Sequence, residues 1–144
     1  MSLEKTKQWF EQAIPDPKVE DCCIQIGCAY EETLELARTM GETEELITPL
    51  EFVSDRYKHK SSLYLAYLSE MSKEEKVQML DDIVDEIVTR IGVGHCMGFD
   101  ILGALEEVNR SNFSKFEDGK PVFDANGKIT KGKNYVKPSL EKFV

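Results

Sequence analysis

The sequence has few of the residues that build soft-metal sites. It holds two histidines and four cysteines, and the cysteines form no CxxC pair, because Cys22 and Cys23 are adjacent while Cys28 and Cys96 stand apart. A structural zinc site is therefore not predicted. The thiols are expected to be reduced, as they are in cytoplasmic proteins.

Long hydrophobic runs are absent as well. The run 91–99 is as long as any stretch without a charged side chain, and it is far shorter than the roughly 20 apolar residues that span a bilayer. Residues 1–14 carry charges throughout and lack the apolar centre of a signal peptide. These absences predict a cytoplasmic protein with no membrane partner.

Basic residues are scarce in most of the chain. Residues 1–109 hold 10 Lys and Arg against 23 Asp and Glu, a net charge of −13, whereas residues 110–144 hold 8 against 4, a net charge of +4. Together they give the overall net charge of −9. No nucleic-acid partner is expected, because such a partner requires a broad basic face. An acidic body with a basic tail instead suits a polyanion held through metal ions on one side and ammonium groups on the other.

Helical periodicity dominates what the sequence does contain. The chain has 144 residues and 41% hydrophobic content, which suits a single domain 1–144. We expect helices over 3–13, from about 17 to about 40, one or two within 43–68 around Pro49, from about 73 to about 96, and from about 101 to about 112. The expected caps are Asp16, which precedes Pro17, then Ser72 in a capping-box pattern with Glu75, and Asp100. The stretch "FDANGKIT" predicts a short hairpin. The predicted fold is therefore all-α: a bundle of about four main helices in a helical body 1–112, with an irregular basic C-terminal arm 113–144.

Two of these helices carry closely spaced carboxylates. "YEETLEL" presents Glu31, Glu32 and Glu35 within an arc of about 100°, and "LDDIVDEIV" places Asp82 and Asp85 three residues apart. Two such groups on two helices can enclose Mg²⁺, which prefers oxygen ligands. The alternative is two solvated faces, because each group lies nearly opposite the main apolar stripe of its helix. Apolar residues in line with the acids favour a face that another helix or a second subunit covers.

The order of these motifs resembles that of a known family. "EETLE", then "DIVD", "EVNRSNFSK" and "DGKPVFDANGKITKGKNY", is similar to the series found in the MazG-like all-α nucleoside triphosphate pyrophosphohydrolases. The nearest branch is the phosphoribosyl-ATP pyrophosphohydrolase-like group, which includes dUTPase-like members. The similarity covers residues 24–138. It implies a hydrolase that uses Mg²⁺, or Mn²⁺ in its place, and splits a nucleoside triphosphate into a nucleoside monophosphate and pyrophosphate.

The resemblance also implies roles for particular residues. The signature EExxE followed by ExxD makes Glu32, Glu35, Asp82 and Asp85 the expected metal ligands, with Glu31 as the catalytic candidate that holds a further ion or accepts a proton from the attacking water. The expected substrate-binding residues are Asn112 for the base or sugar, Lys115 and Lys131 for the phosphates, and Tyr135 for stacking or a hydrogen bond. Three residues depart from the family pattern. Asp82 stands in place of Glu and bears on whether Mg²⁺ is bound directly or through water, whereas Asn109 in place of His and Phe113 in place of Met bear on substrate preference.

The expected partners are a nucleoside triphosphate and further copies of the chain. Helices that are apolar on more than one side favour self-association, and the resemblance implies a homodimer or homotetramer. Two alternatives stay open. A nucleotide-binding sensor would bind nucleotide without turnover, and a non-enzymatic helical adaptor would dock a partner protein through its basic arm without responding to Mg²⁺ or nucleotide.

Overall fold

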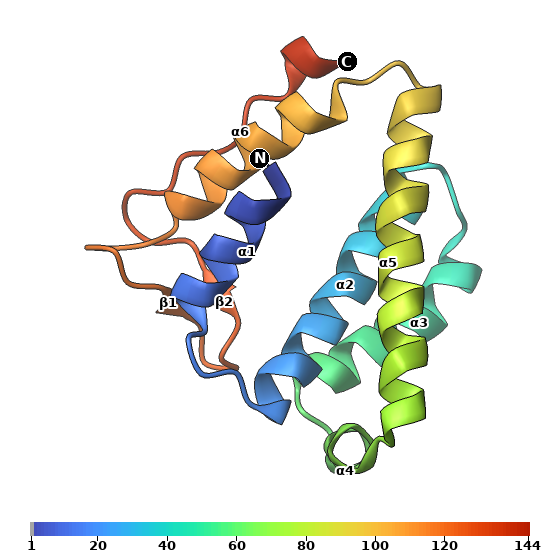
Figure 1. The fold of residues 1–144 in the computed structure, drawn as a ribbon. Helices are drawn as coiled ribbons and strands as arrows, with labels where there is room; N and C mark the ends of the chain where they lie inside the picture. Colours follow the sequence, from blue (N-terminus) through green and yellow to red (C-terminus); the bar gives the residue numbers. More distant parts are fainter. Residues whose placement is uncertain (1) are drawn as a thin grey trace. The chain divides into compact units, whose positions relative to one another are not determined.

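The structure is a computed structural model that describes residues 2–144, which are mostly helical (Figure 1). Its helices are α1 (Ser2–Ala13), α2 (Val19–Thr39), α3 (Glu44–Lys58), α4 (Ser62–Glu70), α5 (Lys73–Cys96) and α6 (Ile101–Phe113). Two short paired strands, β1 (Val122–Phe123) and β2 (Ile129–Thr130), form the hairpin, and a 3-10 turn, η1 (Glu141–Phe143), lies near the C-terminus. The all-α class and the hairpin are confirmed. No helix within 2–144 is both long enough and apolar enough to cross a bilayer.

Capping residues begin two helices as predicted. At the start of α5, Ser72 N donates to Glu75 Oε2 at 2.7 Å, and Glu75 N donates to Ser72 Oγ at 3.2 Å. This reciprocal pair satisfies two backbone donors that have no partner inside the helix. Asp100 begins α6 with a single side-chain bond, in which Asp100 Oδ1 accepts a hydrogen bond from Gly103 N at 2.9 Å.

The first long helix and the proline-containing segment differ from the prediction in detail. Asp16 does not cap α2, which begins after Lys18, where the Lys18 backbone N–H donates to Asp21 at 2.9 Å. Of the one or two helices left open for 43–68, the structure has two, α3 and α4. Pro49 lies inside α3, where it removes one backbone donor but does not end the helix.

The chain divides into two compact units. Unit 1 comprises the residues up to 15 together with 72–122 and 129–144, and unit 2 comprises 16–71 and 123–128. Unit 1 therefore contains α1, α5 and α6, whereas unit 2 contains α2, α3, α4 and the turn of the hairpin. The single domain expected from the sequence stays a prediction.

Unit 2 is organised by a close contact between α2 and α3. Ser54, which is 1% exposed, donates from Oγ to Gly27 O at 2.8 Å. A Cβ atom at Gly27 would lie 2.8 Å from both Ser54 O and Lys58 N, so the absence of a side chain is what lets the two backbones approach. Cys23 and Ile47 are also fully buried in this unit.

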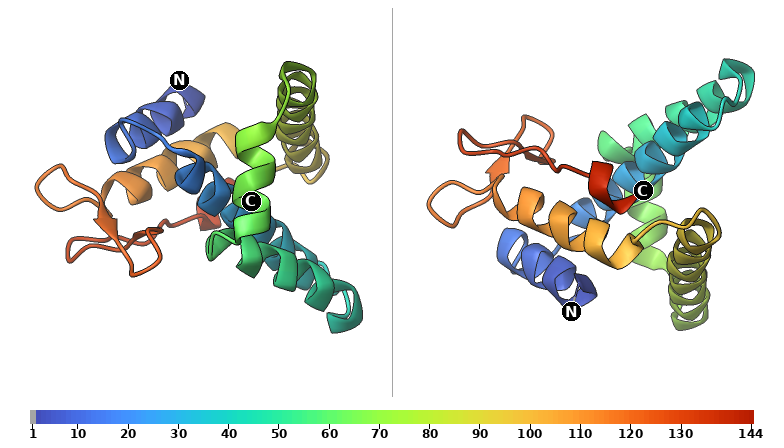
Figure 2. Two further views of the ribbon diagram at one scale, coloured as in Figure 1. Left: turned by 90° about the horizontal axis from the view of Figure 1, so that it is seen from below. Right: turned by 90° about the horizontal axis from the view of Figure 1, so that it is seen from above.

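Unit 1 places α1 beside α6, as both Figure 1 and Figure 2 show. Trp9, Ala13, Phe116 and Ile129 form its buried cluster, in which Trp9 stacks on Phe116 with ring centroids 5.8 Å apart. Trp9 Nε1 donates to Asn112 O at 2.9 Å, so its polar atom is satisfied. The cluster thereby joins α1 to the end of α6 and to β2.

The apolar stripe of α5 lies on the surface of the described chain. Its large apolar side chains range from 39% exposed at Ile91 to 62% exposed at Leu80. The C-terminal end of α5 packs on α6, where Ile101 occupies the space beside Gly94. The helix predicted from this stripe is confirmed, and within unit 1 most of its apolar side is not packed against another helix.

Gly27→Ala is expected to lower the free energy of unfolding by about 1–3 kcal/mol, because the added methyl group overlaps the backbone of α3. Gly92→Ala is the matched control, since nothing lies within 4 Å of a Cβ atom there. It should be neutral or raise the free energy of unfolding by about 0.5–1 kcal/mol. Urea unfolding followed by circular dichroism measures both changes. Equal stability of the two variants would contradict the importance of the close contact.

Candidate functional site

The first acidic group lies on α2, which is an uninterrupted helix through residues 31–35. Glu32 and Glu35 are exposed and lie on adjacent turns, whereas Glu31 is half-buried on the same side as Glu35. Carboxylate oxygens are the hard ligands that Mg²⁺ prefers, with water or phosphate filling the remaining positions. The chemistry of this donor set therefore fits the expected ion.

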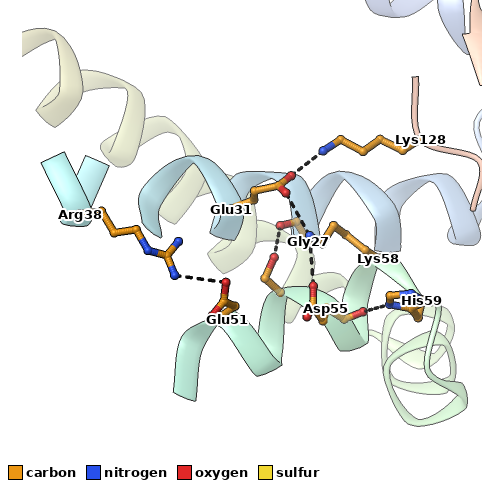
Figure 3. A network of polar contacts seen from close by, with 9 residues as sticks. Gly27, Glu31, Arg38, Glu51, Asp55, Lys58, His59 and Lys128 are labelled. Carbon is orange, nitrogen blue, oxygen red and sulfur yellow. Dashed lines mark hydrogen bonds and ion pairs between the residues drawn. The ribbon is translucent and has the colours of Figure 1, made fainter. Parts of the chain in front are cut away.

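Glu31 lies between two lysines, as Figure 3 shows. Lys58 of α3 donates from Nζ to Glu31 Oε1 at 3.1 Å, and Lys128 at the end of the hairpin turn donates to Glu31 Oε2 at 2.5 Å. Lys58 also pairs with Asp55 at 3.2 Å. The side chains of Glu31, Lys58 and Lys128 are 30%, 19% and 39% exposed, so the cluster is partly shielded from water.

Shielding and hydrogen bonding together set the charge of this cluster. Burial acts to raise the pKa of Glu31, but hydrogen bonds from Lys128 and Lys58 outweigh it and lower the pKa below its ordinary value of 4.5. Burial acts to lower the pKa of both lysines, but their hydrogen bonds to carboxylates raise it above 10.5. All three groups are therefore charged at neutral pH.

Glu31→Gln is expected to lower the free energy of unfolding at pH 7 by roughly 1–2 kcal/mol, because two partly exposed ammonium groups lose a charged acceptor. The folded-state pKa of Glu31 is lowered, so its contribution is present above the unfolded pKa and is lost as pH falls through the folded value. The difference between variant and wild type should therefore shrink below about pH 4.

Urea unfolding at several pH values between about 3 and 7 measures this difference. Glu42→Gln removes one exposed carboxylate elsewhere and should leave the stability within about 0.5 kcal/mol of wild type. A Glu31→Gln effect that stays constant across the pH range would contradict the ionic contribution.

The second acidic group lies on α5, in unit 1. Asp82 and Asp85 are exposed, and Asp82 Oδ1 accepts a hydrogen bond from Gln78 at 3.1 Å. Among residues 2–144, no three His, Cys, Asp or Glu side chains are gathered as a metal site requires. The acids of α2 and those of α5 belong to different units, so a site with four shared carboxylates stays a prediction.

The four substrate-binding candidates lie in unit 1, at the end of α6 and in the arm. Lys131 Nζ lies 4.9 Å from the centre of the Tyr135 ring, so these two candidates are neighbours. Lys115 Nζ lies 5.6 Å from the centre of the Trp9 ring, and Asn112 accepts the Trp9 N–H through its backbone oxygen. Asn112 and Lys115 therefore also contribute to the packing around Trp9.

Asn109, which stands where the family pattern has His, is a buried structural residue. It is 1% exposed, donates from Nδ2 to Ser2 O at 2.7 Å, and accepts a hydrogen bond from Thr6 Oγ1 at 2.9 Å. Both amide atoms are thus engaged in joining α6 to α1. This side chain is occupied within unit 1.

The rest of "EVNRSNFSK" holds the C-terminal arm within unit 1. Arg110 donates two hydrogen bonds to Glu107, at 2.8 and 2.7 Å, and the Ser139 N–H donates to the same carboxylate at 2.9 Å. Ser114 Oγ accepts the Val136 N–H at 2.8 Å. The hydrogen bonds from Arg110 and Ser139 lower the pKa of Glu107 to about 2. This motif therefore has a structural role within unit 1.

Sequence reasoning missed Lys58 and Lys128 as partners of Glu31. They lie 27 and 97 residues from it along the chain. Spacing rules relate side chains three or four residues apart on one helix and say nothing about such distances. The Asn126-Gly127 pair predicted the turn that precedes Lys128, but not the carboxylate that this lysine reaches.

Comparisons of the chain with protein-family models, with curated proteins and with solved structures give no match. The likeness to MazG-like enzymes therefore rests on the sequence motifs.

Proposed function

We propose that this protein is a Mg²⁺-dependent nucleoside triphosphate pyrophosphohydrolase of the MazG-like type, which cleaves between the α- and β-phosphates. One observation carries the proposal: α2 and α5 each present two exposed carboxylates on adjacent turns, Glu32 with Glu35 and Asp82 with Asp85. These two pairs are the oxygen ligands that EExxE followed by ExxD implies. The mostly helical chain agrees with the all-α class of that family.

In the proposed reaction Glu32, Glu35, Asp82 and Asp85 would hold Mg²⁺, and the bound ion would supply positive charge beside the phosphate oxygens and the attacking water. Glu31 is kept deprotonated by its two lysines. Its lowered pKa makes Glu31 a weak base. We therefore favour a role in which Glu31 orients the attacking water or binds a metal ion over a role in which it accepts a proton. Lys115 and Lys131 would contact the phosphates as point charges, while Asn112 and Tyr135 would contact the nucleoside.

Glu35→Ala and Asp85→Ala are each expected to reduce pyrophosphate release by about 100-fold or more, since each removes a charged ligand worth several kcal/mol in the transition state. Turnover by the purified full chain with Mg²⁺ and a mixture of nucleoside triphosphates is the measurement. Glu42→Ala, which removes a carboxylate outside both helices, should retain wild-type turnover. Wild-type turnover in both Glu35→Ala and Asp85→Ala would exclude Glu35 and Asp85 from the mechanism.

A panel of canonical and modified NTPs and dNTPs, including dUTP and dCTP, assayed with Mg²⁺ and with Mn²⁺, identifies the substrate. Binding that raises the melting temperature without turnover would favour a nucleotide sensor. No response to either nucleotide or metal would favour a helical adaptor. The proposed enzyme requires turnover with at least one member of the panel.

We further propose that the active form is a homodimer or homotetramer. The support is the exposed stripe of α5, in which Val77, Leu80, Val84 and Ile87 recur at helical spacing and are each more than 40% exposed. A row of exposed apolar side chains on one side of a helix is typical of an interaction site. A second copy of the chain offers the same stripe, so a symmetric contact can cover both.

Leu80→Glu is expected to weaken self-association about tenfold or more, because burying a leucine side chain contributes about 1.5–3 kcal/mol. Light scattering coupled to size exclusion at several protein concentrations measures the mass. Gln8→Glu adds the same charge at an exposed position of α1 and should leave the mass unchanged. A wild-type protein that stays monomeric at high concentration would exclude the proposed assembly.

A further inference from the structure

Unit 2 contains a pair of ammonium groups that the proposed mechanism does not use. Lys58 and Lys128 come from α3 and from the hairpin turn, yet both donate to the carboxylate of Glu31, one to each oxygen (Figure 3). The contact between Gly27 and Ser54 explains why Lys58, one of the two lysines, lies close to Glu31. Lys58 N and Cγ would lie 2.8 and 2.6 Å from a Cβ atom at Gly27, so the Lys58 side chain leaves α3 at the contact itself, and it reaches Glu31, which lies about one helical turn from Gly27 along α2.

The pair has the chemistry of a phosphate site. An ammonium group offers three donors to oxygen acceptors, and phosphate presents several acceptor oxygens with negative charge. At 19% and 39% exposure, the two lysine side chains are accessible to solvent but less screened than at an open surface. The carboxylate of Glu31 already shows that a two-oxygen anion fits between them.

We propose that Lys58 and Lys128 form a binding site for the phosphate groups of the substrate or of the pyrophosphate product, and that Glu31 occupies this site until the anion displaces it. The identity of the anion rests on the proposed function. Glu31 directly precedes Glu32, an expected metal ligand, so a carboxylate that turns away from the lysines stays beside the expected metal ligands on α2. The two lysines act on the phosphates through their charge.

The balance of charge gives the proposal a distinctive consequence. Lys58 and Lys128 face Glu31 and Asp55, so the four charges cancel and leave little attraction for an added anion. Replacing Glu31 by Gln leaves a net charge of +1 at the same position. Pyrophosphate should therefore bind more tightly to Glu31→Gln than to wild type, an effect that a purely structural ion pair would not produce.

Lys60 supplies a matched control within the same unit. Its Nζ donates to Asn126 O at 3.0 Å, so it contacts the same hairpin turn but not the Glu31 carboxylate. Lys60→Met removes a positive charge close to the site in sequence and structure. It should change the affinity for pyrophosphate by no more than about twofold relative to the same protein with Lys60 intact, because a charge outside the site is largely screened by solvent and salt.

The test is isothermal titration of the full chain with sodium pyrophosphate in metal-free buffer. Glu31→Gln is expected to bind at least about tenfold more tightly than wild type, and Lys58→Met or Lys128→Met added to Glu31→Gln should remove that gain. Adding Lys60→Met to Glu31→Gln should preserve it. An affinity of Glu31→Gln no higher than that of wild type would overturn the proposal.

A second measurement uses the wild-type chain and needs no variant to fold. Saturating pyrophosphate should slow acetylation of Lys58 and Lys128 relative to Lys60, as read by mass spectrometry, with chloride at equal ionic strength as the reference. Equal protection of all three lysines would also overturn the proposal. Repeating both measurements with a nucleoside triphosphate that carries a methylene α,β-bridge distinguishes a site for the intact substrate from one for free pyrophosphate.

These outcomes separate the anion site from the proposed enzyme. Tight pyrophosphate binding by Glu31→Gln, with no turnover of any nucleotide in the panel, would leave the anion site standing and exclude the hydrolase. Nucleotide turnover by wild type, with no higher pyrophosphate affinity in Glu31→Gln, would support the hydrolase and exclude the anion site.

Discussion

The close approach of α2 and α3 at Gly27 is the constraint on which unit 2 depends. Ser54 Oγ donates a hydrogen bond to the Gly27 carbonyl across this contact, and a side chain at Gly27 would collide with the backbone of α3. Because Lys58 leaves α3 at this contact and Glu31 lies one turn from Gly27 along α2, the contact also brings the Lys58 ammonium group within reach of Glu31. A packing requirement thereby determines the electrostatic surroundings of a candidate catalytic carboxylate.

Those surroundings change the role that Glu31 can take. A carboxylate held by two ammonium groups stays ionised at neutral pH and is a weak proton acceptor. Glu32 and Glu35, in contrast, are exposed on the same helix and suit a hydrated divalent ion. Three neighbouring glutamates therefore divide into one that is half-buried between two lysines and two that are exposed. This division places the acidic signature of α2 beside two basic residues, Lys58 and Lys128.

Local signals predicted the helices well, because helix starts depend on neighbouring residues. Ser72 with Glu75 and Asp100 with Gly103 form the caps that their spacing indicates. The prediction of Asp16 as a cap was wrong, because Asp21 binds the Lys18 backbone N–H and α2 begins later. For the candidate site, spacing placed the acids on adjacent turns of two helices, whereas the convergence of those helices on one ion stays a prediction.

The sequence by itself determined the all-α class, the capped helices, the hairpin turn and the spacing of the carboxylates, since each depends on residues within a few positions of one another. Only the tertiary structure decided that Lys58 and Lys128 meet at Glu31, and that Asn109 is buried between α1 and α6. These contacts join residues 27 to 107 positions apart. They follow from how whole helices pack, and periodicity within one helix carries no information about the neighbour against which it packs.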